Sequence, residues 1–89
     1  MRAIVSVLGK DQVGIVAKIS TCLMNYNVNI DDISQNVLES IFNMIMYVDI
    51  SNIKGSYNDL SASLEKIGDT VGLQVRIQKE EIFTAMHRI

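Results

Sequence analysis

The sequence predicts one α+β domain whose elements follow the order β-α-β-β-α-β. Two segments, 2–8 and 42–50, place apolar residues at every second position, with the period of a half-buried strand. Two others, 16–26 and 60–71, repeat apolar residues every three or four positions, as a helix with one buried face does. The 89 residues, 48% of them hydrophobic, are enough to fill one core.

A glycine-containing junction, 9–14, joins the first strand to the first helix. Ala3, Val5 and Val7 share the inner face of the strand at 2–8. Asp11 stands where a helix N-cap is expected, because its carboxylate can accept hydrogen bonds from first-turn amides. The apolar positions of the helix that follows are Val16, Ile19, Leu23 and Tyr26.

The first helix leads into a strand with an irregular pattern. Asn25 and Asn27 flank the helix end, and asparagine tolerates the left-handed backbone found there. The strand at 28–37 changes its apolar parity between Ile30 and Ile33. A β-bulge near Asp31-Asp32 would explain the change.

The second half of the chain repeats the scheme. Residues 38–40 are a short connection to a strand that completes a hairpin, with one face formed by Phe42, Met44, Met46, Val48 and Ile50. Ser56 and Asp59 resemble a capping box at the start of a second helix, which ends at Gly72. The buried face of this helix is predicted at Leu60, Leu64, Ile67 and Val71. The last strand contains Leu73, Val75 and Ile77.

Two strand-helix-strand units with right-handed crossovers, joined by a hairpin, give the ferredoxin-like fold: a four-stranded antiparallel sheet with two helices on one face. The domain is expected over 1–80, with a short C-terminal helix at 81–89 as its tail. The uncovered sheet face would carry Ile4, Leu8, Ile41, Ile45 and Tyr47 beside Arg2, Ser6 and Asn43. Such an apolar face predicts coverage by the tail or by a second copy, and we expect a homodimer.

Charge and composition narrow the function classes. The formal charge of −2, from 8 basic and 10 acidic residues, gives no basic field, so nucleic acid is not an expected partner. No apolar run approaches the ~20 residues of a membrane span, and no membrane partner is expected. The single cysteine, Cys22, falls in a helical apolar pattern and is expected in the core. One cysteine suits a reducing compartment, so the predicted location is cytoplasmic.

The junction itself could hold a small zwitterion. A helix N-terminus presents unpaired amides and a positive dipole end, which suit a carboxylate, and Gly14 has no side chain to block its approach. Asp11 could accept hydrogen bonds from a nearby ammonium group. The helix start and Asp11 together therefore match the carboxylate and the ammonium group of an α-amino acid. The ligand-free alternative also remains open: Gly9 turns the chain, Asp11 caps the helix and Gly14 allows tight packing.

Three stretches together resemble the ACT domain: Asp11-Gln12-Val13-Gly14-Ile15-Val16-Ala17-Lys18-Ile19, then Asn27-Val28-Asn29-Ile30, then Ile33-Ser34-Gln35. With the element order, the resemblance covers residues 1 to about 80. The chain looks most like small stand-alone ACT proteins and the ACT modules of the glycine-cleavage-repressor type.

The resemblance implies a regulatory module that binds a small amino acid at a subunit interface, performs no chemistry on it and needs no cofactor. It places a ligand loop at Gly9, Lys10, Asp11, Gln12, Val13, Gly14 and Ile15. It also places Asn29 and Ile30 on the facing strand end, where Asn29 would orient the amino acid head group. Many members have proline where this chain has Val13, which implies a less rigid loop. The regulated protein would be a separate chain.

Other activities of this fold lack their residues here. Acylphosphatases need an arginine in the first loop, but none lies between Arg2 and Arg76. Small metal chaperones need two neighbouring thiols, whereas this chain has only Cys22. RNA-binding sheets of this fold stack bases on several aromatic side chains, whereas Tyr47 is the one aromatic residue expected on the open face. Adjacent strand acids such as Asp31-Asp32 point to opposite faces, so no metal site is predicted. No catalytic residue is assigned and an enzyme is not expected; the alternative to ligand binding is a ligand-free protein-protein interaction module.

Overall fold

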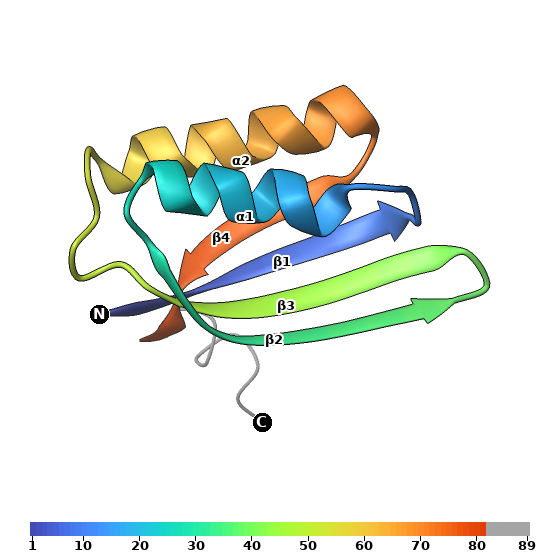
Figure 1. Ribbon diagram of the computed structural model, residues 1–89, viewed down its shortest axis with the longest axis horizontal. Helices are drawn as coiled ribbons and strands as arrows, with labels where there is room; N and C mark the ends of the chain where they lie inside the picture. Colours follow the sequence, from blue (N-terminus) through green and yellow to red (C-terminus); the bar gives the residue numbers. More distant parts are fainter. Residues whose placement is uncertain (82–89) are drawn as a thin grey trace.

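The computed structural model describes residues 1–81 and confirms the predicted order and the ferredoxin-like fold (Figure 1). The elements are β1 (Arg2–Lys10), α1 (Ile15–Asn25), β2 (Asn29–Leu38), β3 (Ile41–Asp49), α2 (Tyr57–Val71) and β4 (Gln74–Lys79). The strands form one antiparallel sheet in the order β2-β3-β1-β4. Both helices lie on the same face of this sheet. Of the helical tail predicted at 81–89, residues 82–89 lie outside the described part of the chain.

The core fills the space between the two helices and the sheet. Cys22 is 8% exposed and belongs to this core, as predicted. Val16 and Tyr26 are only half-buried, because α1 turns Ile15 and Cys22 inward as well. The side chains with no exposed surface include Val5, Val7, Ile19, Leu23, Met44, Met46, Val48, Leu60 and Leu64.

The start of α1 differs from the sequence prediction. α1 begins at Ile15, and its N-cap is Gly14 in a left-handed conformation (φ 85°, ψ 7°). The prediction of Asp11 as N-cap is therefore wrong. β1 continues to Lys10, so Asp11 still belongs to the end of the sheet, where its backbone N–H donates to Ser40 O at 2.8 Å. Residues 12–14 then connect the end of the sheet to the start of α1 in the helix layer.

The ends of the other elements agree with the sequence signals. Asn27 adopts positive φ (57°) just after α1. At the start of α2 the Ser56 hydroxyl accepts a hydrogen bond from the Asp59 backbone N–H at 3.0 Å. Gly72 ends α2 at φ 76°, where a residue with a side chain would be strained.

β2 is an edge strand and carries the predicted bulge. Its pairing with β3 shifts register between Ile30 and Asp32, so Asp31 is the extra residue. The β2–β3 connection is a two-residue turn, in which Glu39 and Ser40 both have positive φ. Apart from Ile30, which is half-buried, every β2 residue is exposed.

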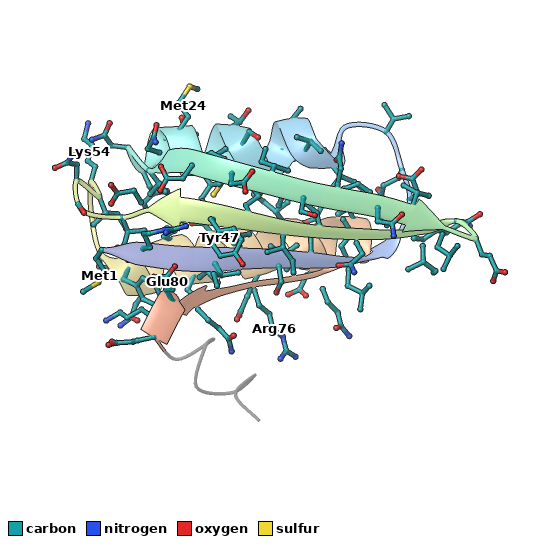
Figure 2. All side chains as sticks on the ribbon, turned by 90° about the horizontal axis from the view of Figure 1, so that it is seen from below. Met1, Met24, Tyr47, Lys54, Arg76 and Glu80 are labelled. Atoms are coloured by element: carbon teal, nitrogen blue, oxygen red, sulfur yellow. The ribbon has the colours of Figure 1, made fainter. Side chains whose placement is uncertain are left out.

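Neither α1 nor α2 covers the second face of the sheet, and Figure 2 views the molecule from this side. The pairing register places the predicted open-face residues of β1 and β3 side by side, for example Ile4 opposite Tyr47 and Leu8 opposite Asn43. Ile4 is 2% exposed, whereas Leu8 and Ile41 are 46% and 47% exposed. These apolar residues share one face, as predicted, but only its end toward the β2–β3 turn is exposed, because Ile4 is buried and Ile45 and Tyr47 are half-buried.

Candidate functional site

The β1–α1 loop, residues 11–14, is held at both sides by hydrogen bonds. The backbone N–H of Asp11 donates to Ser40 O, in the β2–β3 turn, at 2.8 Å. The side-chain amide of Gln12 donates to Val71 O, at the end of α2, at 2.9 Å. These contacts fix the loop between the hairpin and the last turn of α2. Its backbone is thus positioned before any ligand arrives.

The loop leads into an α-helix start that no side chain of the described part of the molecule caps. Gly14 makes no side-chain cap hydrogen bond, so first-turn amides of α1 remain available at the positive end of the helix dipole. A Cβ built on Gly14 would meet no heavy atom of residues 1–81 within 4 Å. Val13, next to it, is 99% exposed. The arrangement can accept an anion from solvent.

Tight packing occurs at Gly9 instead of Gly14. A Cβ on Gly9 would lie 2.4 Å from Leu73 Cδ2 and 3.3 Å from Leu73 Cα. Gly9 is therefore a β1 residue that lets the start of β4 approach, and the two roles assigned to these glycines in the ligand-free alternative are wrong. Gly14 is needed for its positive φ and leaves open space beside it.

The loop does not enclose a ligand within one chain. The hollow beside Gln12, Val13 and Ile15 has a cavity volume of ≈ 0 Å³. Lys10 and Asp11 are exposed at the same end of the sheet. Any ligand bound here would need further walls.

Asn29 and Ile30 lie at a second, polar hollow of ≈ 410 Å³. The side-chain amide of Asn29 donates to Asp31 Oδ1 at 2.9 Å, so its carbonyl oxygen and its second amide hydrogen remain for other partners. The hollow is also lined by Ser20, Met24, Asn27, Val28, Asp49 and Asn52. Sequence reasoning did not single out Asp49, Asn27 or Asn52 for a site. Asp49 could have been found from the pairing register of β2 with β3, which sets it opposite Asn29.

Asp49 is the acid of this hollow. Hydrogen bonds from the side chain and the backbone N–H of Ser51 are the main reason why the pKa of Asp49 lies below its ordinary value. The Met1 amino group, 3.6 Å from the carboxylate, lowers that pKa further. Asp49 is therefore ionised at neutral pH and can attract a cationic group.

The two groups of predicted site residues are not brought together in one chain. The loop follows Lys10, which pairs with Ile41, whereas Asn29 pairs with Asp49 at the other end of β3. From Ile41 to Asp49 the strand advances by eight residue steps, about 26 Å at ~3.3 Å per residue. The structure thus places Gly9–Ile15 and Asn29–Ile30 at opposite ends of the same sheet.

Residues 1–81 contain no cluster of three or more His, Cys, Asp or Glu side chains that could hold a metal ion. None of the helices in this range is both long and apolar enough to cross a membrane.

Comparisons with known proteins agree with the fold. The sequence profile of the ACT domain matches residues 2–78. A UPF0237 protein of Methanocaldococcus jannaschii is 52% identical over 88 residues, which are 99% of this chain and 98% of that protein.

The structure of an ACT domain protein from Streptococcus pneumoniae superposes with a TM-score of 0.79 at 41% identity and covers 93% of both chains. The regulatory subunit of aspartate kinase from Thermus thermophilus, in its ligand-free form, gives a TM-score of 0.65 at 25% identity, over 86% of this chain and 50% of that one. The chain belongs to the ACT domain family, whose members are typically small-molecule regulatory modules.

Proposed function

We propose that this protein is a non-enzymatic, cytoplasmic regulatory homodimer that binds a small amino acid between its two subunits. The observation that carries the proposal is the separation of the two half-sites. The loop at Gly9–Ile15 and the hollow at Asn29 lie at opposite ends of the edge strand β2 and its neighbours. A second copy is therefore required to complete a site.

Antiparallel pairing of β2 with β2 of a second copy would complete it. A two-fold axis through the middle of β2 sets the Asn29 end of one strand beside the Leu38 end of the other. The Leu38 end is the end at which the loop leaves β1, because Leu38 pairs with Ile41 and Ile41 with Lys10. Each of two equivalent sites would then combine one subunit's loop with the other subunit's Asn29.

The surface of β2 supports this choice of interface. An exposed edge strand presents unpaired backbone groups that another strand can use. On the helix side of β2, Ile33 and Val37 are 40% and 49% exposed. Pairing two such edges would bury these apolar side chains and extend the sheet to eight strands.

The chemistry of the completed site matches a zwitterion. First-turn amides of α1 can donate to an α-carboxylate, since no side chain within residues 1–81 caps them. Asp11 of the same loop can accept from the ammonium group. Asn29 of the neighbouring subunit, whose carbonyl oxygen is free of its bond to Asp31, offers a further acceptor.

A thermal melt against the twenty amino acids tests the proposal. An amino acid present at about 100 times its dissociation constant should stabilise the native protein by ~2.7 kcal/mol, which raises the Tm by roughly 10–20 °C in so small a domain. Asp11→Ala and Asn29→Ala should each abolish the shift while the unliganded Tm stays within a few degrees of wild type.

A panel without any shift would contradict ligand binding. A dimer in sedimentation equilibrium together with a flat panel would favour the second candidate, a ligand-free interaction module. The observation behind that candidate is the apolar end of the open sheet face, where Leu8, Leu38 and Ile41 are 46%, 71% and 47% exposed.

A further inference from the structure

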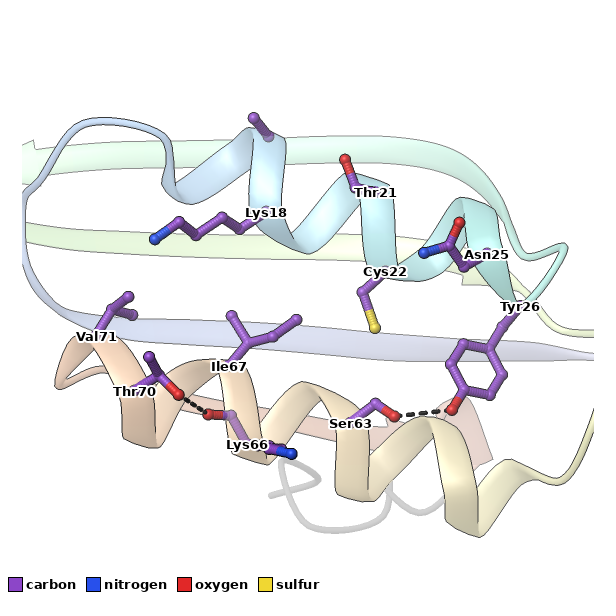
Figure 3. A pocket seen from close by; sticks show the side chains of 11 residues that line it. Lys18, Thr21, Cys22, Asn25, Tyr26, Ser63, Lys66, Ile67, Thr70 and Val71 are labelled. Carbon is purple, nitrogen blue, oxygen red and sulfur yellow. Dashed lines mark hydrogen bonds between the residues drawn. The ribbon is translucent and has the colours of Figure 1, made fainter.

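A groove of ≈ 630 Å³ runs between α1 and α2 on the face turned away from the sheet (Figure 3). Cys22 projects from α1 into the groove, and Ile67 and Val71 project from α2. These side chains form an apolar floor above the buried core. The groove shares no lining residue with the hollow at Asn29.

One end of the groove is closed by hydrogen bonds between the helices. The Tyr26 hydroxyl lies 2.8 Å from Ser63 Oγ, as Figure 3 shows, and also donates to Asp59 O at 3.3 Å. At the other end, the Gln12 side chain is bonded to Val71 O. The Tyr26 contacts tie the end of α1 to α2, and Gln12 ties the loop before α1 to the end of α2. Because the chain is held to α2 before and after α1, the spacing of the helices is restrained and the groove is preformed.

The groove carries positive charge in an acidic protein. Lys18 of α1 and Lys66 of α2 lie on opposite walls, and no acid is present among its lining residues in the described part of the chain. The whole chain has a formal charge of −2. In Figure 3 the Lys18 ammonium points toward the Val71 end and the Lys66 ammonium toward the Ser63 end. A partner with negative charge on both sides of an apolar stripe would complement this surface.

We propose that this groove binds an amphipathic helix of a partner protein. The apolar stripe of that helix packs on Cys22, Ile67 and Val71, and acids on its two flanks pair with Lys18 and Lys66. Ser63 and Val71 are eight residues apart on α2, about 12 Å, which matches two turns of a docked helix. The inference rests on the proposed function: in a dimer built through β2, the groove would be the surface that the amino acid sensor offers to the protein it regulates.

Two other occupants fit less well. A second copy related by a two-fold axis would set the lysines of one groove against those of the other, which is repulsive. A single small carboxylate would meet only one of two ammonium groups that point apart. A helix with acids on both flanks meets both.

An NMR titration of the ¹⁵N-labelled full chain tests the inference. The probe is a synthetic helix of about 18 residues with a leucine stripe flanked by glutamates. We expect saturable shifts at groove residues such as Thr21, Ile67 and Thr70. Binding should weaken about tenfold in Lys18→Glu/Lys66→Glu, and a second probe flanked by lysines should prefer that variant.

The matched control, Lys54→Glu/Arg76→Glu, makes the same charge change outside the groove and should bind the first probe as wild type does. If the Glu double variant fails to fold, Lys18→Gln/Lys66→Gln replaces it and should also weaken binding. The absence of saturable shifts, shifts on the open sheet face, or equal weakening by the control would overturn the inference. Self-association through the helix layer in sedimentation experiments would overturn it as well.

Discussion

Gly68 lies on the buried side of α2, where the helix meets the start of β4. A Cβ there would be 2.6 Å from Leu73 O and 2.9 Å from Val75 Cγ2. Gly68→Ala should therefore lower the free energy of unfolding by about 1–3 kcal/mol through overpacking. It should do so although alanine gains ~1 kcal/mol in helix propensity over glycine. Urea denaturation measures the change.

The control for this prediction is Asp69→Ala, one residue further along α2 and exposed. It changes helix propensity without adding an atom to the core, so its stability should stay within about 0.5 kcal/mol of wild type or rise. Stabilisation by Gly68→Ala would show that β4 can move away from α2.

Asp49 makes the free energy of unfolding fall more steeply as the pH is lowered into the acid range. Because hydrogen bonds from Ser51 hold its folded-state pKa below the ordinary 3.8, Asp49 contributes stability that is fully present above that value. The contribution is lost as pH falls through the folded-state pKa. The stability difference between wild type and Asp49→Asn should therefore be constant at pH 5–7 and shrink progressively below about pH 4. Urea unfolding at each pH gives this difference, and Asp69→Asn serves as the exposed control. A difference that grew in acid would contradict the assigned cause.

At the level of elements, the β2–β3 turn uses residues that fit its backbone poorly. Glu39 and Ser40 have φ of 50° and 69°, the signature of a turn that favours Asn-Gly. Glu39→Asn/Ser40→Gly should raise the free energy of unfolding by about 1 kcal/mol. Ser34→Gly, within β2, is the control and should lower it by roughly 0.5–1 kcal/mol. A loss of stability in the double variant would mean that the present side chains have partners worth more than the strain.

The elements themselves could be predicted because their signals are local. Alternation in β3, the Ser56 cap, Gly72 and the parity change near Asp31 each depend on a few neighbouring residues, and all were confirmed. The start of α1 could not be placed in this way. Asp11 and Gly14 are both acceptable N-caps, and the choice between them depends on how far β1 pairs with β3. That pairing is a long-range contact which no local pattern reports.

At the level of the whole molecule, the candidate site shows why sequence spacing is an incomplete guide. The stretches at Gly9–Ile15 and Asn29–Ile30 are close in sequence, but one helix carries the chain across the sheet between them. The distance of about 26 Å follows from the strand length. In the proposed dimer the two-fold axis joins them, and such symmetry leaves no periodic signal in a single chain.

Subunit mixing tests whether each site is shared by two chains. Asp11→Ala chains lack the loop acid and Asn29→Ala chains lack the facing amide, so homodimers of either variant should not bind the amino acid found in the melts. In a mixed dimer, one site combines the intact loop of the Asn29→Ala chain with the intact Asn29 of the Asp11→Ala chain. After random exchange of equal amounts, about one quarter of all sites should regain wild-type affinity in calorimetry. Mixing Asp11→Ala with the double variant Asp11→Ala/Asn29→Ala should restore none, because no intact loop is present. A site shared across the two-fold axis must regain binding in the first mixture and not in the second. If neither mixture regains binding, Asp11 and Asn29 do not act in one shared site.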